Sequence, residues 1–299
     1  MKNAIDVNNL TKEYRNIIAL ENITISCTHS KIYGLLGRNG AGKTTLMHLL
    51  AGQLLPTEGS INIYGENVYE NKETLNKICY VGPFSNINNY VKTFRVRDFL
   101  KTASLFYPDW DQDFADRLIR LFSLDIKKHY RNLSAGMLSM VAIVISLASR
   151  APLTLLDEPY TGLDAAARQE FYDILAEDYS NHPRTIIFST HLIDEASKLF
   201  EDVILLHQGR ILLQEPIETL EESSFMVSGD EEKLKSMLSN KKVINIEYMG
   251  RRATYSLFDT LSEPEKTVLT QADLEIRSLT LQQLFVYLTA NKEGYDVKF

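Results

Sequence analysis

The sequence is poor in cysteine, in basic charge and in long apolar runs, and each shortage argues against a class of protein. Cys27 and Cys79 are isolated and lack metal-ligand spacing, so a disulfide framework and catalytic cysteine chemistry are disfavoured. The 39 acidic and 32 basic residues leave a net charge of -7, which argues against a nucleic-acid partner. The most apolar segment, residues 137–148, is shorter than the about 20 residues of a membrane-spanning helix. Any membrane role therefore requires a partner chain.

The length and the N-terminal residues indicate a folded chain without a leader. At 299 residues the chain can form one large domain with a smaller extension, since a core of that size buries most of its apolar surface. Residues 1–6 are not followed by the long apolar stretch of a secretion signal. We therefore expect the protein to begin near Met1. No internal repeat or low-complexity tract is evident.

The apolar pattern predicts strands that alternate with helices. Alternation of apolar and polar residues indicates half-buried strands at residues 4–7, 23–26 and 59–65. Continuous apolar runs predict strands covered on both faces at residues 32–36, 153–156 and 185–188. Helical spacing marks residues 96–106, 114–122 and 165–175. This alternation predicts an α/β fold with a parallel core and an additional β layer near the N-terminus.

The strand succession is interrupted once and later extended. Residues 86–151 show only helical patterns, so we expect an inserted helical subdomain between the two parts of a nucleotide-binding core, 1–85 and 152–214. Residues 215–299 predict a small α+β accessory region. Its expected strands are 225–227, 243–248 and 252–258, and its expected helices are 231–238 and 280–289.

A phosphate-binding loop follows the first buried strand. Residues 37–44 read Gly-Arg-Asn-Gly-Ala-Gly-Lys-Thr, which fits G-x-x-x-x-G-K-[ST], and residues 46–50 continue as a helix. The glycines let backbone N–H groups converge on phosphate oxygens, and the helix N-terminus adds partial positive charge. Lys43 is expected to reach the β- and γ-phosphates, and Thr44 to bind Mg²⁺. A plain glycine-rich turn is the alternative, but a chance match is expected in only about 1% of chains of this length.

Two acids end the second buried strand. Asp157 and Glu158 follow Leu153-Thr154-Leu155-Leu156, which places Asp157 where it can hold Mg²⁺ through water. Glu158, at the exit of the strand, can orient the attacking water or accept its proton. Two solvated acids at a strand end are the simpler alternative.

The next motifs resemble those of the ABC ATPase family over about residues 5–213. Residues 132–137, Asn-Leu-Ser-Ala-Gly-Met, resemble its signature motif, which in that family contacts the γ-phosphate held by the opposing subunit. Residues 161–164, Thr-Gly-Leu-Asp, resemble its D-loop, and His191 after Ser189-Thr190 resembles its switch histidine. A lone signature string could equally be a helix cap, and a lone histidine is more often structural. The order of the motifs favours the functional interpretation.

This resemblance implies a P-loop NTPase fold and a site for ATP and Mg²⁺. Glu158, His191 and Lys43 would be catalytic, and Thr44 and Asp157 would hold the metal. Tyr14 occupies the place of the family's adenine-stacking aromatic, although it could equally be a surface tyrosine. The residues expected to bind nucleotide are Tyr14, Gly37, Arg38, Asn39, Gly40, Ala41, Gly42, Lys43, Thr44, Thr45, Ser134, Gly136 and Asp164.

The sequence departs from the family at one position. The family usually has a glutamine that touches Mg²⁺ and water after a strand like residues 78–81, and Pro83 stands there instead. Proline offers no side-chain oxygen. A water, Ser85 or Asn86 could substitute, and the alternatives stay open. The link from this loop to a membrane subunit is in question for the same reason.

The resemblance also implies partners and a location. ABC ATPases work as dimers, so a homodimer or a heterodimer with a related ATPase is expected, together with a separate transmembrane permease at the cytoplasmic face of the cell membrane. The segment 279–286 looks like that of ABC-2-type exporters, and residues 132–137 and 181–206 resemble YtrB-like ATPases and exporters of phenol-soluble modulins. That suggests a peptide or cell-envelope amphiphile as cargo. A non-transport ABC-type ATPase and a binding-only regulatory module are the alternatives.

Overall fold

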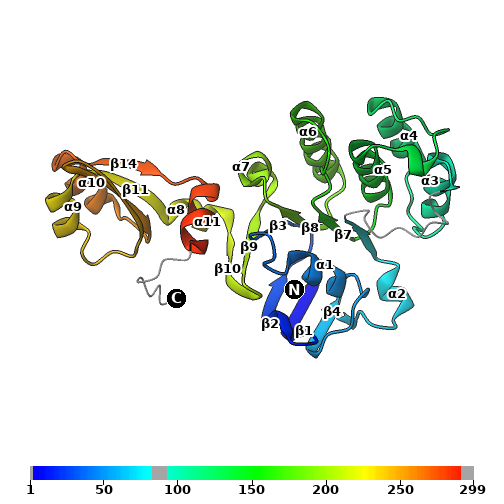
Figure 1. The fold of residues 1–299 in the computed structure, drawn as a ribbon, viewed down its shortest axis with the longest axis horizontal. Coiled ribbons are helices and arrows are strands. Elements are labelled where there is room, and N and C mark those ends of the chain that lie inside the picture. Colours follow the sequence, from blue (N-terminus) through cyan, green and yellow to red (C-terminus); the bar gives the residue numbers. More distant parts are fainter. Residues whose placement is uncertain (1–2, 83–92, 291–299) are drawn as a thin grey trace. The chain divides into compact units, whose positions relative to one another are not determined.

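The computed structural model describes residues 3–82 and 93–290. The chain divides into two compact units, Met1–Gln214 and Glu215–Phe299, and each is described by itself. Figure 1 follows the chain through both.

The larger unit is built around a six-stranded sheet (Figure 1). Its strands, in order across the sheet, are β10 (Arg210–Pro216), β9 (Asp202–His207), β3 (Ile32–Leu36), β8 (Thr185–Thr190), β7 (Leu153–Asp157) and β6 (Ile78–Val81). From β9 to β6 every neighbouring pair is parallel. Every residue of β3, β7 and β8 is buried, as expected for continuous apolar strands covered on both faces. The predicted parallel core is confirmed.

A second sheet provides the additional β layer. Its strands, in order, are β2 (Ile17–Cys27), β1 (Ile5–Tyr14), β4 (Glu58–Ile63) and β5 (Glu66–Asn67), all antiparallel. Helix α1 (Lys43–Leu50) contributes Leu46, Met47 and Leu49 to a buried cluster that also holds side chains of both sheets. The first helix after the phosphate-binding loop is thereby fixed by apolar packing on both sides.

Strands β1 and β2 are longer than the sequence predicted. The expected strands, residues 4–7 and 23–26, cover only parts of them. The pairing of β1 with β2 shifts register after Val7 and again after Leu10, and Asn9 and Asn22 have φ of 47° and 50°. Such bulges break the alternation on which strand prediction depends, so the rest of both strands was missed.

Helices occupy the described residues between β6 and β7. They are α3 (Val96–Ser104), α4 (Gln112–Leu121) and α5 (Ala135–Ala148). The apolar run at 137–148 forms most of α5, which is buried from Val141 to Ala148. Within residues 3–82 and 93–290 no helix has the length and apolarity to cross a membrane. Helices α6 (Ala165–Asn181) and α7 (Ile193–Ala196) follow β7 and β8, and α2 (Lys72–Leu75) precedes β6.

The smaller unit has its own α+β fold. Its sheet has the order β12 (Val243–Met249), β13 (Arg252–Phe258), β11 (Ser224–Asp230) and β14 (Glu275–Ser278), and all pairs are antiparallel. Helices α8 (Ile217–Glu222), α9 (Glu231–Met237), α10 (Glu263–Gln271) and α11 (Leu281–Thr289) accompany it. A buried cluster that includes Val227, Leu234 and Leu257 forms its core. The sequence did not predict α10 and β14, because both are short and mostly exposed.

Candidate functional site

The phosphate-binding loop joins β3 to α1, as the motif predicted. Gly40 and Gly42 have φ of 80° and 109°, a region that disfavours side chains. A Cβ on Gly42 would lie 2.8 Å from the Ala19 carbonyl oxygen, and one on Gly37 would lie 2.6 Å from that of Leu206. The loop is therefore compressed between the β1–β2 layer and β9, and neither glycine has room for a side chain.

Lys43 lies inside this loop with its charge directed at backbone carbonyls. Its Nζ donates to the carbonyl oxygens of Gly37 at 2.7 Å and Arg38 at 3.3 Å, and the residue is only 7% exposed. Burial lowers the pKa of Lys43, while the negative charges of Glu158 and Asp157 act in the opposite direction. A buried cation thus lies near two carboxylates. This arrangement suits a phosphate group that binds together with a metal ion, the phosphate at the cation and the metal at a carboxylate.

A cavity of about 680 Å³ opens above the loop. Its wall contains the expected Asn39 to Thr45, Asp157 and Glu158. It also contains residues that were not predicted: Ile17, Ile18, Ala19, Thr161, Gln208 and Gly209. Gln208 and Gly209 form the turn between β9 and β10, with φ of 47° and 77°, and the Gly209 N–H donates to the Ala41 carbonyl. A Gln-Gly pair between two strands is a turn signal, but nothing in the sequence brings that turn to the loop.

The two acids at the end of β7 have different environments. Asp157 is 1% exposed, and its Oδ2 has no hydrogen-bond partner within the described part of the chain. Glu158 lies on the cavity wall with φ of 50°, an uncommon conformation for a residue with a side chain. Its N–H donates to the Ser189 carbonyl at 3.1 Å, and its carbonyl accepts from the Thr161 hydroxyl at 2.9 Å. These bonds hold the acid at the mouth of the site.

His191 lies beside Glu158, a contact that the motifs did not predict, and its expected catalytic role stays a prediction. Its Nδ1 is 2.8 Å from Glu158 Oε2, and its backbone N–H donates to the Tyr160 hydroxyl at 3.2 Å. The Tyr160 hydroxyl also lies 2.6 Å from the Thr190 hydroxyl. Tyr160 was not among the predicted site residues, although it anchors the segment that carries the histidine.

The signature residues lie outside the cavity. Ser134 caps α5 by accepting from the Met137 N–H at 3.2 Å. A Cβ on Gly136 would lie 2.5 Å from the Gly162 carbonyl oxygen, so the start of α5 rests directly against the D-loop of the same chain. The Ser139 hydroxyl donates to the Thr161 carbonyl at 2.6 Å. Among the described residues that line the cavity, neither Ser134 nor Gly136 is present.

The structure places two further predicted residues, Asp164 and Tyr14, whose expected roles stay predictions. Asp164 caps α6 by accepting a hydrogen bond from the Ala167 N–H at 2.9 Å, and its expected part in nucleotide binding stays a prediction. Tyr14 is 43% exposed at the end of β1, with the Lys12 Nζ 5.0 Å from its ring centroid, and it is not on the cavity wall. Pro83 lies outside the described residues.

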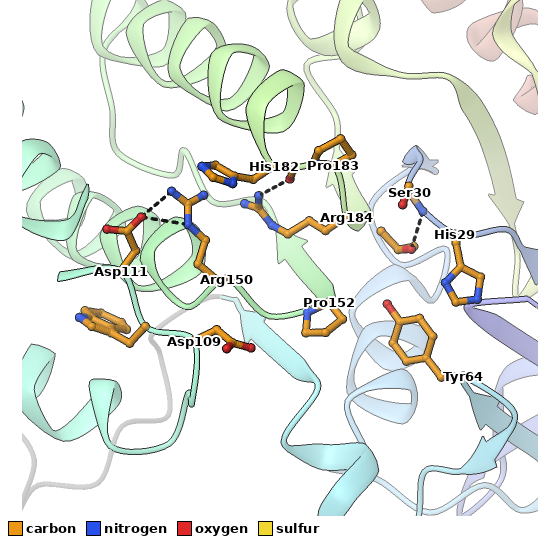
Figure 2. Close-up of a pocket in the computed structure, with 12 residues that line it drawn as sticks. His29, Ser30, Tyr64, Asp109, Asp111, Arg150, Pro152, His182, Pro183 and Arg184 are labelled. Atoms are coloured by element: carbon orange, nitrogen blue, oxygen red, sulfur yellow. Dashed lines mark hydrogen bonds and ion pairs between the residues drawn. The ribbon is translucent and has the colours of Figure 1, made fainter. Parts of the chain in front are cut away.

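A second cavity, of about 710 Å³, lies near the ends where β7 and β8 begin (Figure 2). Beside it, charged side chains join the inserted helices to the core. Asp178 of α6 forms ion pairs with both Arg150 and Arg184, and Arg150 also pairs with Asp111 at 2.9 Å. Asp178 and Arg184 are 5% and 6% exposed. Two guanidinium groups thus share one buried carboxylate.

Replacing Asp178 with alanine should destabilise the protein. The substitution leaves Arg150 and Arg184 without their shared carboxylate, and breaking a buried ion pair from one side costs about 3–5 kcal/mol. Urea unfolding of the full chain measures the change. Glu177→Ala is the matched control, because the neighbouring Glu177 pairs with Arg117 at the surface and should contribute less than about 1 kcal/mol. Equal effects of the two substitutions would contradict the prediction.

Comparison with known proteins supports the interpretation of these motifs. Residues 20–161 match the family model described as ABC transporter. The bacitracin transport ATP-binding protein BcrA of Bacillus licheniformis is 29% identical over 222 residues, which cover 74% of this chain and 72% of BcrA. The ABC transporter ATP-binding protein YtrB of Bacillus subtilis (strain 168) is 25% identical over 207 residues, 69% of this chain and 70% of YtrB.

A solved structure described as the ATP-binding subunit of an ABC transporter shares the fold. Its TM-score is 0.64 at 24% identity, over 73% of this chain and 92% of that structure. The predicted P-loop NTPase fold, with its parallel core and antiparallel layer, is therefore confirmed. The chain belongs to the ABC transporter family as one of its ATP-binding subunits, which are ATPases.

Proposed function

We propose that this ATPase powers export through a separate transmembrane permease, at the cytoplasmic face of the cell membrane. The similarity to BcrA, which is described as a bacitracin transport protein, and to YtrB supports a bacterial transport role. It favours a peptide or a cell-envelope amphiphile as cargo. The absence of a helix in residues 3–82 and 93–290 that could cross a membrane is compatible with a permease encoded as another chain.

The observation that carries the proposal is the separation of the two halves of the site. The cavity wall holds the phosphate-binding loop, Asp157 and Glu158, whereas Ser134 and Gly136 lie elsewhere on the same chain. Two chains arranged head to tail would place Ser134 of one against the phosphates held by Lys43 of the other. ATP would then bind the closed dimer better than the open one, and a ligand shifts a conformational equilibrium only through such a difference. A related ATPase could replace the second copy.

The residues present fit a magnesium ion. Asp157 supplies a buried carboxylate oxygen with no partner in the described part of the chain, and Thr44 lies on the same cavity wall. No group of three or more His, Cys, Asp or Glu residues in that part could hold a metal alone, which agrees with an ion that takes its other ligands from phosphates and water. The ion would supply positive charge against the charge that develops on the phosphoryl oxygens.

The protein groups divide the remaining work. Lys43, held at the loop carbonyls, would bind the β- and γ-phosphates when nucleotide enters. Glu158, at the cavity wall, would orient the attacking water and accept its proton. His191 contacts Glu158 in this structure, and we propose that it turns to the γ-phosphate when ATP is bound. Tyr14 would stack on the adenine.

Co-purification tests the link to a permease. Tagged wild-type chain, expressed in its native host and extracted from membranes with mild detergent, should bring down a protein with several membrane-spanning segments. ATP hydrolysis by that complex should exceed hydrolysis by the isolated chain. A chain that is recovered from membranes and cytosol without such a protein would refute the transport proposal while leaving the ATPase assignment intact.

A further inference from the structure

Tyr80 carries a buried hydroxyl that has no hydrogen-bond partner in the described part of the chain, on the strand next to the one that ends at Asp157. Tyr80 is on β6, beside β7, and the two strands pair in parallel with Tyr80 opposite Leu155 and Val81 opposite Leu156. The next residue along the chain is Gly82 on one side and Asp157, the last residue of β7, on the other. The Tyr80 hydroxyl oxygen is shielded from solvent and has no hydrogen-bond partner in the described part of the chain. A buried hydroxyl without a partner is costly.

The ring of Tyr80 packs against α1 and folds forward along its own strand. It packs with the same buried cluster as Leu155, and it meets the His48 ring of α1 edge-on at 5.2 Å between centroids. A Cβ on Gly82 would collide with the Tyr80 hydroxyl oxygen. The hydroxyl thus fills the space that a side chain at residue 82 would need, on the strand next to the one that ends at Asp157.

Two unpaired oxygens therefore lie at one edge of the sheet. Asp157 Oδ2 and the Tyr80 hydroxyl are both buried and lack protein partners among the described residues. Burial, and then the charge of Asp157, raise the pKa of Tyr80. The phenol stays neutral near pH 7, so its oxygen keeps lone pairs that can accept and its proton can be donated. A site of this kind is suited to an ordered water between the two groups.

We infer that Tyr80 takes the role of the glutamine that the family has at the position of Pro83. Its hydroxyl oxygen accepts a hydrogen bond from a water bound to the metal ion that Asp157 holds. Mg²⁺ keeps several of its waters in protein sites, and groups that hold such waters tune metal affinity. In the family, the glutamine at the position of residue 83 supplies an oxygen. In this chain, Tyr80 supplies one from three residues earlier. Gly82 leaves the space for it. The inference rests on the magnesium site proposed above.

The experiment compares ATP affinity with Mg²⁺ and with EDTA, measured by displacement of a fluorescent ATP analogue from the full chain. Tyr80→Phe keeps the ring and removes the hydroxyl. It should leave the affinity in EDTA unchanged and reduce the gain in affinity that Mg²⁺ gives by roughly tenfold. Tyr172→Phe is the matched control, because Tyr172 on α6 also has a buried hydroxyl without a partner in the described part of the chain. Its Mg²⁺-dependent gain should equal that of the wild type.

A rescue separates metal binding from packing. In the double variant Tyr80→Phe/Pro83→Gln, the added amide oxygen should restore most of the Mg²⁺-dependent gain. A gain in Tyr80→Phe within about twofold of the wild type would overturn the inference, as would a loss that Pro83→Gln does not restore. Wild-type affinity for ATP that does not respond to Mg²⁺ would refute the proposed metal site itself, and with it the role of Tyr80.

Discussion

Replacing Glu158 with glutamine should reduce ATP hydrolysis by about 10²- to 10⁴-fold, the range that a positioned general base contributes. Glutamine has nearly the same shape but cannot accept the proton of the attacking water. ATP affinity should change little, because the phosphate-binding loop and Asp157 remain. The Glu158–His191 contact of 2.8 Å can persist as a neutral hydrogen bond. Steady-state phosphate release, with nucleotide affinity measured in parallel, checks both parts.

The same variant should accumulate a dimer in ATP. Closed dimers that cannot hydrolyse ATP have no path back to the open state except nucleotide release, so size-exclusion chromatography with Mg²⁺–ATP should show a species of twice the mass. Glu195→Gln is the control: Glu195 pairs with Arg168 and lies off the cavity wall. It should hydrolyse ATP at the wild-type rate. Normal turnover in Glu158→Gln would refute the assignment of this acid.

Lys43→Ala should weaken ATP binding by at least about 100-fold, which corresponds to about 2.7 kcal/mol. The Lys43 ammonium is buried against the loop carbonyls, and each charge-assisted bond to a phosphate contributes about 1.5–3 kcal/mol. Isothermal titration with ATP and Mg²⁺ measures the loss. Lys31→Ala is the control, because Lys31 pairs with Asp202 where β3 and β9 begin, away from the cavity. Its ATP affinity should stay that of the wild type.

Mixing variants tests the head-to-tail arrangement. A Lys43→Ala chain and a Ser134→Arg chain should each be inactive alone. In a mixed dimer one of the two sites combines an intact Lys43 with an intact Ser134, so hydrolysis should return on mixing. No recovery from two chains that form mixed dimers would contradict the homodimer and leave a heterodimer with a different ATPase.

Sequence reasoning located the parts of the site that are contiguous in the chain. The loop 37–44, the acids after β7 and the histidine after β8 were found because each motif follows a buried strand, and parallel strands bring their carboxyl ends to one edge. Gln208 could not be found in this way. It reaches the cavity because β9 is the neighbour of β3, and strand order is not written in local sequence.

The sequence also could not show which contacts a motif residue makes within its own chain. Ser134 and Asp164 were predicted from motifs as nucleotide-binding residues, and in the structure both cap helices. Sequence alone could not separate a helix cap from a role in nucleotide binding. The pairing of Asp178 with two arginines depends on the packing of α6 against the inserted helices. Arg150 and Asp178, for example, are 28 positions apart and lie on different parts of the fold. No rule of residue spacing predicts such a contact.

The contact between the D-loop and α5 has a consequence for cooperativity. Thr161 bonds to the Glu158 carbonyl on one side and to Ser139 of α5 on the other, and Gly162 lies against Gly136. In the proposed dimer, a change at the acid of one chain would reach, through these contacts, the helix that completes the site of its partner. By thermodynamic linkage, ATP binding at the first site changes the free energy of ATP binding at the second by the same amount as the reverse. The proposed dimer would then respond to ATP more steeply than a single site, with a Hill coefficient above one.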